Sequence, residues 1–184
     1  MQNNSVKPSD LNPHLQFDAA SGELQFESTE LSGLAQEFGT PLYVYSATSI
    51  KSAYRAYASA CQGLAQVTIC YAVKANSNIH ILKLLAQEGA GFDIVSAGEL
   101  ARVIAAGGAP EKAVFAGVGK STQEIEYALE QGVGCFNVES EAEMQRVAQV
   151  AEKMQRIANV SLRVNPDVDA KTHPYISTGL KENK

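Results

Sequence analysis

Short apolar runs recur five times along the chain, and a stretch with the spacing of an amphipathic helix lies between successive runs. The runs read VTICYAVKA, GFDIVS, AVFAG, GCFNVES and VSLRVNP. Their ends lie near Lys74, Val95, Ala116, Val138 and Val164. The intervals between these ends are about 21, 21, 22 and 26 residues, a strand and helix repeat that is typical of parallel α/β architecture.

Helix start and stop signals separate the runs. Ser121 with Glu124, and Ser140 with Glu143, fit the capping box, in which a serine and a glutamate satisfy free backbone N–H groups of the first turn. Gly89 ends an apolar face between the first two runs and marks a helix stop. We therefore expect a helix between successive strands.

The repeat alone fits two α/β folds, an open doubly wound sheet and a (β/α)8 barrel. Neither GxGxxG nor GxxxxGK[ST] follows the first run, so the phosphate-binding loop of nucleotide-binding folds is missing. A (β/α)8 barrel has eight units and roughly 250 residues, whereas this chain has 184 residues and ends on the polar stretch HPYISTGLKENK. We predict a partial, TIM-like (β/α)8 barrel of about five of the eight units, and the chain looks unfinished.

The first part of the chain does not share the repeat. LQFDAASGELQF, Leu15 to Phe26, places two alternating segments around a turn and predicts a β-hairpin. A helix is expected from Ser28 to Phe38, with Ser28 or Thr29 as its N-cap. We divide the chain into an N-terminal segment, residues 1–36, and an incomplete barrel domain, residues 37–184.

Composition excludes several classes of function. The net charge is -5 and no dense lysine and arginine cluster occurs, which argues against nucleic acid and against an anionic membrane surface. Cys61, Cys70 and Cys135 have neither CxxC spacing nor a histidine pair nearby, so no disulfide framework and no metal site are expected. No apolar run reaches the roughly 18 residues of a membrane span, and we expect a cytoplasmic protein.

Lys74 closes the first apolar run, in YAVKANSN. In an alternating strand, Cys70, Ala72 and Lys74 share one side, so the lysine points with two small residues toward a confined interior. Burial would lower the pKa of the amine and make it a nucleophile that can form a Schiff base with a carbonyl cofactor. The alternative is a lysine at the end of a strand with its ammonium in solvent.

The sequence around Lys74 resembles a known family. YAVKAN, followed about 19 residues later by GFDIVSAGEL, resembles the fold-type III pyridoxal phosphate enzymes, and the continuation ANSNIHIL is typical of their amino-acid decarboxylases rather than of alanine racemases. LRVNPDVDAKTHPYISTGLKENK, residues 162–184, looks like the matching segment of the diaminopimelate decarboxylase family. The similarity extends from about Pro41 to the last residue.

The resemblance implies roles for three residues. Lys74 would bind pyridoxal 5'-phosphate covalently and later take part in proton transfer at the substrate α-carbon. Asp93 would lie near the cofactor, and its alternative role is to cap the following helix. Arg163 would lie beneath the cofactor, and its alternative role is a structural ion pair inside the barrel.

Other residues receive no single role. Glu99 would support the site or only be a favourable acid in the first turn of a helix. Asn76, Asn78 and Asn137 would orient the cofactor or cap helices. His173 lies in the segment most particular to the family, but no role follows from that position.

The resemblance also implies function and assembly. The complete protein would convert meso-2,6-diaminopimelate to L-lysine and carbon dioxide as a homodimer with its active site at the subunit interface, and the N-terminal hairpin would join a β-rich second domain. The family's phosphate-binding segment and late catalytic residues cannot be located, so this chain alone is expected to be inactive. Alternatives are a decarboxylase of the ornithine or arginine type and a noncatalytic pyridoxal phosphate carrier.

Overall fold

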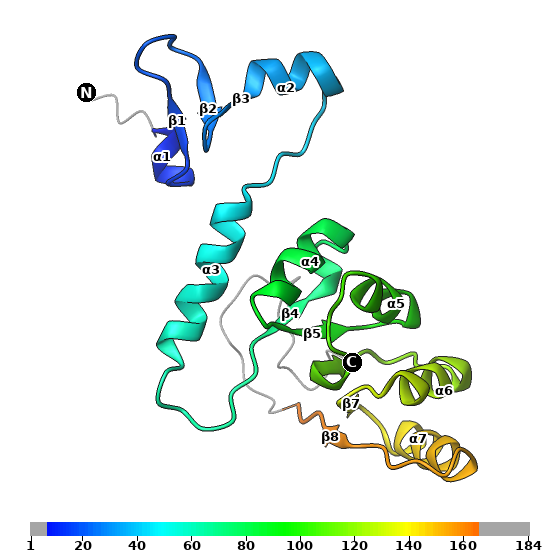
Figure 1. Cartoon of the computed structure of the whole chain (residues 1–184). Helices are drawn as coiled ribbons and strands as arrows, with labels where there is room; N and C mark the ends of the chain where they lie inside the picture. The colour runs from blue at the N-terminus through cyan, green and yellow to red at the C-terminus, as the bar shows by residue number, and fades with distance from the viewer. Residues whose placement is uncertain (1–6, 166–184) are drawn as a thin grey trace.

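The computed structural model describes residues 7–165, which form two separate sheets (Figure 1). The N-terminal unit is an antiparallel sheet in the order β1, β2, β3 with a helix at either end. Its elements are α1 (Pro8–Leu11), β1 (Leu15–Phe17), β2 (Leu24–Phe26), β3 (Thr29–Glu30) and α2 (Leu31–Phe38).

The N-terminal unit contains the predicted hairpin, because β1 and β2 pair with Leu15 opposite Phe26. The predicted start of the next helix is wrong. Thr29 and Glu30 continue the sheet as β3, so α2 begins at Leu31, and its N-cap, Glu30, makes no side-chain capping bond. The predicted boundary between residues 36 and 37 falls inside α2, and the division into domains stays a prediction.

The second sheet has five parallel strands in sequential order. They are β4 (Cys70–Ala72), β5 (Gly91–Ile94), β6 (Ala113–Phe115), β7 (Cys135–Val138) and β8 (Val160–Leu162). The crossover helices are α4 (Ile79–Gln87), α5 (Ala97–Ala105), α6 (Thr122–Gln131) and α7 (Glu141–Lys153), with 3-10 turns η1 (Val73–Ala75) and η2 (Pro110–Lys112). The helix α3 (Ala47–Ala60) precedes β4 and packs against α4.

This strand order distinguishes between the two α/β folds. A doubly wound sheet reverses its strand order at a switch point, whereas the wall of a barrel adds each new strand beside the previous one. The five described strands follow one another without reversal, and all four crossover helices lie along one side of them (Figure 1). The prediction of a partial (β/α)8 barrel with about five units is confirmed.

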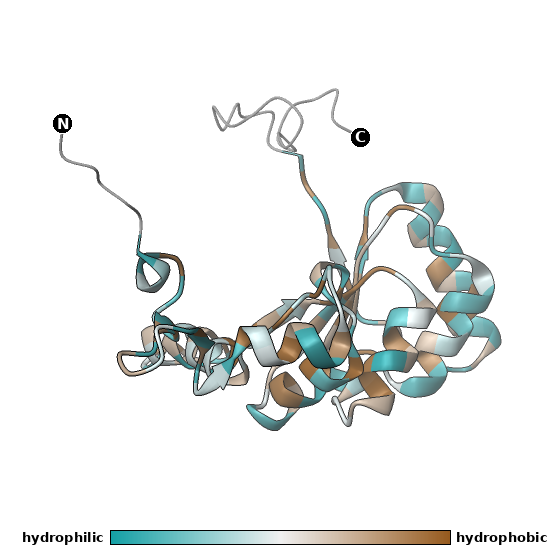
Figure 2. Cartoon of the chain, turned by 90° about the horizontal axis from the view of Figure 1, so that it is seen from above, coloured by the Kyte–Doolittle hydropathy of each residue, from teal (hydrophilic) through white to brown (hydrophobic). Residues whose placement is uncertain are grey.

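The core lies between the parallel sheet and its helices. Phe92, Phe115 and Phe136, on β5, β6 and β7, are fully buried there, and the Phe115 and Phe136 rings stack with centroids 6.0 Å apart. The outer sides of the helices are largely hydrophilic (Figure 2). Because side chains alternate along a strand, Asp93 and Asn137 lie on the other face, which we call the open face.

The Glu27 carboxylate accepts hydrogen bonds that link the N-terminal unit to the start of α3. One oxygen of the Glu27 carboxylate accepts bonds from the Ser46 hydroxyl, at the N-cap, and from the Thr48 backbone N–H at 3.0 Å. These bonds, the Ser46 bond first, lower the pKa of Glu27 from its ordinary value of 4.5. Asn12 adds a second link by accepting a bond from the Ser49 hydroxyl at 3.1 Å.

Replacing Glu27 with alanine should make the Thr48 amide exchange its hydrogen faster, because that N–H loses its carboxylate acceptor. Since folding lowers the Glu27 pKa, the stabilisation is present above about pH 4.5 and is lost as the pH falls through the folded value. Hydrogen exchange, expressed relative to an unstructured peptide, checks both effects. Glu37→Ala, an exposed change on α2, is the control, and equal protection of Thr48 in both variants would contradict the assignment.

None of the helices between residues 7 and 165 is both long and apolar enough to cross a membrane. The helix α3 has 14 residues and α7 has 13. A span of the hydrocarbon layer needs about 20 mostly apolar residues.

Candidate functional site at the ends of the parallel strands

Lys74 lies in the 3-10 turn η1, two residues beyond the end of β4. Its side chain is exposed, so the predicted placement on an alternating strand in a confined interior is wrong. The strand pattern stops at Ala72, and β4 is an edge strand of the described sheet. Two environments were considered for Lys74, a confined interior and solvent. Among the described residues its side chain is exposed to solvent.

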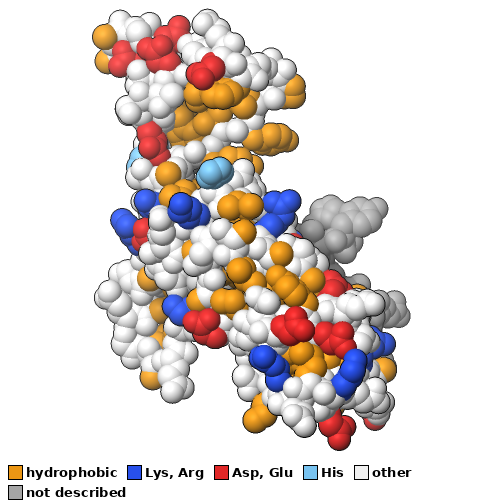
Figure 3. Space-filling model, turned by 45° about the vertical axis from the view of Figure 1, so that its right-hand side comes forward, with side chains coloured by type: hydrophobic (Ala, Val, Ile, Leu, Met, Phe, Trp, Pro, Cys, Tyr) orange, Lys and Arg blue, Asp and Glu red, His pale blue; other side chains and the backbone are white. Residues whose placement is uncertain are grey.

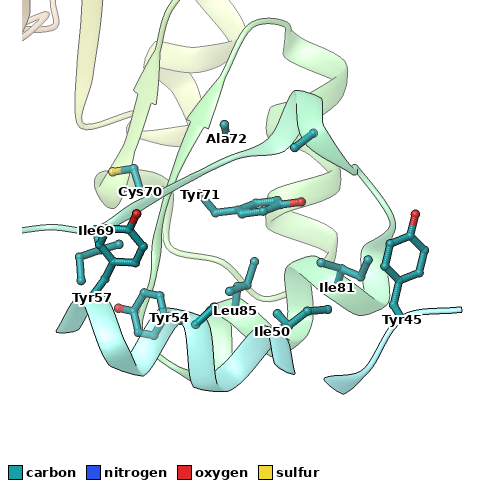
Figure 4. Close-up of a pocket in the computed structure, with 12 residues that line it drawn as sticks. Tyr45, Ile50, Tyr54, Tyr57, Ile69, Cys70, Tyr71, Ala72, Ile81 and Leu85 are labelled. Atoms are coloured by element: carbon teal, nitrogen blue, oxygen red, sulfur yellow. The ribbon is translucent and has the colours of Figure 1, made fainter. Parts of the chain in front are cut away.

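The turn that carries Lys74 is held in place from both sides. Val73 is fully buried, and the Tyr71 hydroxyl donates a hydrogen bond to the backbone carbonyl of Asn76 at 3.2 Å, across the turn. In Figure 4 the Tyr71 ring lies in a hollow between β4, α3 and α4. This hollow has a volume of about 510 Å³ and a mainly apolar lining, and burial there raises the pKa of Tyr71.

The asparagines after Lys74 act on the backbone. Asn78 is the N-cap of α4, and its side-chain oxygen accepts a bond from the His80 N–H at 2.9 Å. Asn76 accepts a bond from the Asn78 N–H at 3.0 Å. Of the two roles considered for Asn78, helix capping is therefore the one that the structure shows.

Asp93 lies on β5 directly beside Ala72 of β4, on the open face. It does not cap the next helix, because the N-cap of α5 is Ser96, whose hydroxyl oxygen accepts a bond from the Glu99 N–H at 3.2 Å. The carboxylate is partly buried, and within residues 7–165 it has neither a hydrogen bond nor an ion pair. A partly buried anion with no partner among these residues is available to a ligand.

Glu99 stabilises the end of the strand that carries Asp93. One of its carboxylate oxygens accepts a bond from the Val95 N–H at 2.7 Å, directly after β5. Glu99 also lies in the first turn of α5, where a negative charge is favourable. The structure thus gives Glu99 a backbone partner.

Arg163 follows β8 at the far edge of the sheet. Its N–H donates to the Val138 carbonyl at 2.9 Å, and its guanidinium donates to the Glu139 carboxylate at 3.3 Å. The Arg163 side chain is 38% exposed and that of Glu139 only 9%. The ion pair that we considered as the alternative role is therefore present.

The sheet brings only two of the three predicted site residues close together. Lys74 follows β4 and Asp93 lies on the neighbouring strand β5, whereas Arg163 follows β8, three strands beyond β5 or roughly 14 Å at the usual strand spacing. All three lie toward the carboxyl ends of parallel strands, the edge at which barrel enzymes form their sites. His173 lies outside the described residues.

A buried ion pair at the same edge was not predicted. Lys120, in the loop after β6, is 2% exposed and Glu143, on α7, is 5% exposed, and their charged atoms lie 2.7 Å apart. The predicted capping box at Ser121 and Glu124 is confirmed. At α7 only half of it forms: Ser140 caps the helix, but the Glu143 carboxylate accepts from the Glu139 N–H at 2.8 Å.

These residues fit a ligand with a carbonyl and a cationic or hydrogen-bond-donating group. Lys74 offers an accessible amine on a fixed turn, and Asp93 a carboxylate with no described partner beside it. Ala72, between them on the open face, is small and leaves room. The arrangement suits covalent attachment of a carbonyl compound to Lys74, with Asp93 on the strand next to the one that leads into the Lys74 turn.

Comparisons with known proteins agree with this chemistry. Residues 47–184 match the family described as pyridoxal-dependent decarboxylase, pyridoxal binding domain. The chain is 59% identical over 168 residues to the diaminopimelate decarboxylase of Pseudomonas aeruginosa. The match covers 91% of this chain and 40% of that protein.

Solved structures show the same similarity. The diaminopimelate decarboxylase from M. jannaschi superposes with a TM-score of 0.85 at 38% identity, over 94% of this chain and 41% of that one. The Helicobacter pylori enzyme complexed with L-lysine gives a TM-score of 0.79 at 49% identity, over 83% of this chain and 38% of that one. The chain thus spans about two fifths of the length of these relatives.

Proposed function

The chain belongs to the family of pyridoxal-dependent decarboxylases, and we propose from this membership that the protein carrying it converts meso-2,6-diaminopimelate to L-lysine and carbon dioxide with pyridoxal 5'-phosphate. The observation that carries the proposal is the 59% identity to a diaminopimelate decarboxylase over 91% of the chain. The L-lysine bound to the Helicobacter pylori enzyme fits a lysine product.

Two further observations weigh against the alternative functions. The lysine/ornithine decarboxylase from Vibrio vulnificus is 24% identical to this chain, a level at which the likeness concerns the fold alone. The sheet formed by β1, β2 and β3 precedes the barrel segment, and a one-domain carrier of pyridoxal phosphate would not need it.

Three residues of this chain would hold the cofactor. Pyridoxal phosphate, when bound, supplies an electron sink for the charge left on the α-carbon as carbon dioxide departs. Lys74 would be the residue that holds the cofactor covalently, through its Nζ, and its amine would be the group that carries a proton to the substrate α-carbon. Asp93 would offer a carboxylate on the strand next to β4, which leads into the Lys74 turn, and Arg163 a guanidinium at the opposite edge of the sheet.

The experiment that tests the cofactor assignment is borohydride reduction followed by peptide mapping. The whole protein, purified with pyridoxal phosphate, is reduced, denatured and weighed, and the modified peptide is sequenced. We expect one reduced pyridoxyl group per chain, on Lys74. A protein that acquires no adduct, or acquires it on another lysine such as Lys83, would contradict the proposal.

A homodimer in the cytoplasm is the assembly that we propose. Hydrophobic side chains gather on the surface of the N-terminal unit (Figure 3). Phe17 and Phe38 of this unit and Tyr43, in the segment that follows it, are 60%, 64% and 86% exposed. Exposed apolar patches of this kind often mark contacts between proteins or domains. Light scattering of the whole protein should give twice the mass of its chain, and a monomer at micromolar concentration would contradict the dimer.

A further inference from the structure

The buried Lys120 ammonium lies where the ends of β6 and β7 meet. Its three N–H groups donate to the Gly117 carbonyl at 2.7 Å, the Asn137 carbonyl at 2.8 Å and the Glu143 carboxylate at 2.7 Å. The Phe115 ring lies beneath it, with the centroid 5.5 Å from Nζ. All three donors are used, so Lys120 itself has no donor left for a ligand.

The partners of Lys120 fix the end of β7. The Lys120 ammonium donates to the backbone carbonyl of Asn137, and the backbone N–H of Arg163 donates to the carbonyl of Val138. The Glu143 carboxylate accepts from the backbone N–H of Glu139. One backbone group of each of three consecutive residues, 137 to 139, is therefore held by a hydrogen bond. Glu143 can serve both sides because one oxygen faces Lys120 and the other faces Glu139.

The fixed end of β7 carries the carboxylate that orients Arg163. The side chain of Glu139 is 9% exposed and accepts from the Arg163 guanidinium at 3.3 Å. Both residues line a hollow of about 420 Å³ at the ends of β7 and β8. A shift of the Glu139 backbone would therefore move the carboxylate that faces Arg163.

We infer that Lys120 is a positioning residue for Arg163: through Asn137 and Glu143 the buried ammonium fixes Glu139, and Glu139 holds the guanidinium in the orientation that binds the cofactor. This inference rests on the proposed function, in which Arg163 contacts pyridoxal phosphate. Lys120 would act only through this chain of contacts, because the three donors of its ammonium are already used within the protein.

The test is a thermodynamic cycle on the affinity of the whole apo protein for pyridoxal phosphate, measured by absorbance titration. The variant Lys120→Met/Glu143→Gln removes both buried charges together and leaves an amide oxygen for the Glu139 N–H, so that it can fold. It is made alone and with Arg163→Ala. Lys153→Met, which breaks an exposed ion pair with Glu126, is the control.

We expect the double variant to bind the cofactor about tenfold more weakly, with less than about twofold further loss when Arg163 is already alanine, because coupled residues are not additive. Glu139→Gln, which leaves the buried pair intact, should weaken binding in the same direction, and Lys153→Met should not. Circular dichroism verifies folding of each variant, and Glu139→Gln provides the test should the double variant not fold.

The opposing outcomes separate the two proposals. Unchanged affinity in Glu139→Gln or in a folded double variant, or the same loss with and without Arg163, would overturn the positioning role alone. Unchanged affinity in Arg163→Ala would overturn the positioning role and the assignment of Arg163 to the cofactor, and would leave the attachment to Lys74 standing. An unchanged protein that binds no pyridoxal phosphate would overturn the proposed function, and this inference with it.

Discussion

Decarboxylation by the whole protein is expected to fall by a factor on the order of 10³ or more when Lys74 is replaced by alanine. A side chain that forms the covalent link to the reacting group cannot be compensated by neighbouring residues, and removal of such nucleophiles elsewhere has effects of at least this size. Release of carbon dioxide from diaminopimelate measures the rate. Loss of the absorbance band of the bound cofactor, at equal protein concentration, measures the attachment.

Lys74→Ala should leave the fold unchanged, because the Lys74 side chain is exposed and the turn is held by Val73 and Tyr71 instead. Lys83→Ala is the matched control, since Lys83 is also an exposed lysine and lies on α4, the helix that follows the Lys74 turn. We expect it to keep both turnover and absorbance. Normal turnover by Lys74→Ala would exclude Lys74 as the attachment point, whatever the control does.

Local signals in the sequence were enough to predict the partial barrel. The capping box at Ser121 and Glu124 lies within one helical turn, and the strand runs are continuous segments, so both can be read without knowledge of distant contacts. The same holds for the hairpin between Leu15 and Phe26. The start of α2 was missed because β3 depends on pairing with β2, which no local pattern of Thr29 and Glu30 indicates.

The environment of the site residues was predicted less well from the sequence, because it depends on contacts between successive strand and helix units of the barrel. Lys74 was expected to be buried because alternation was extended two residues past Ala72, where the chain in fact turns. Lys120 and Glu143 are 23 positions apart and meet only because two successive strand and helix units stack side by side. A lysine in a loop and a glutamate in the first turn of a helix are individually ordinary, and no local pattern indicates that they pair.

The second large effect concerns that buried pair and the stability of the protein. Lys120→Met alone should destabilise the fold by about 3–5 kcal/mol, because the Glu143 carboxylate stays buried after losing its cation. For a domain of 150 to 250 residues, 3 kcal/mol corresponds to a drop in melting temperature of roughly 6–12 °C. Thermal unfolding of the apo protein, followed by circular dichroism, gives this number.

Lys120→Met/Glu143→Gln should recover at least about half of the lost stability, since no charge remains buried without a partner and methionine still covers the Phe115 ring. The ion pair of Arg55 and Glu88 is the contrast, because the Arg55 side chain is 65% exposed although the charged atoms lie 2.6 Å apart: Arg55→Met should lower the melting temperature far less than Lys120→Met. If Lys120→Met and Arg55→Met lowered the melting temperature equally, burial of the ammonium would not be what stabilises the end of β7. The same double variant separates the effect on stability from the effect on the orientation of Arg163. It should recover stability, but it lacks the hydrogen bond to Asn137 through which we infer that Lys120 orients Arg163.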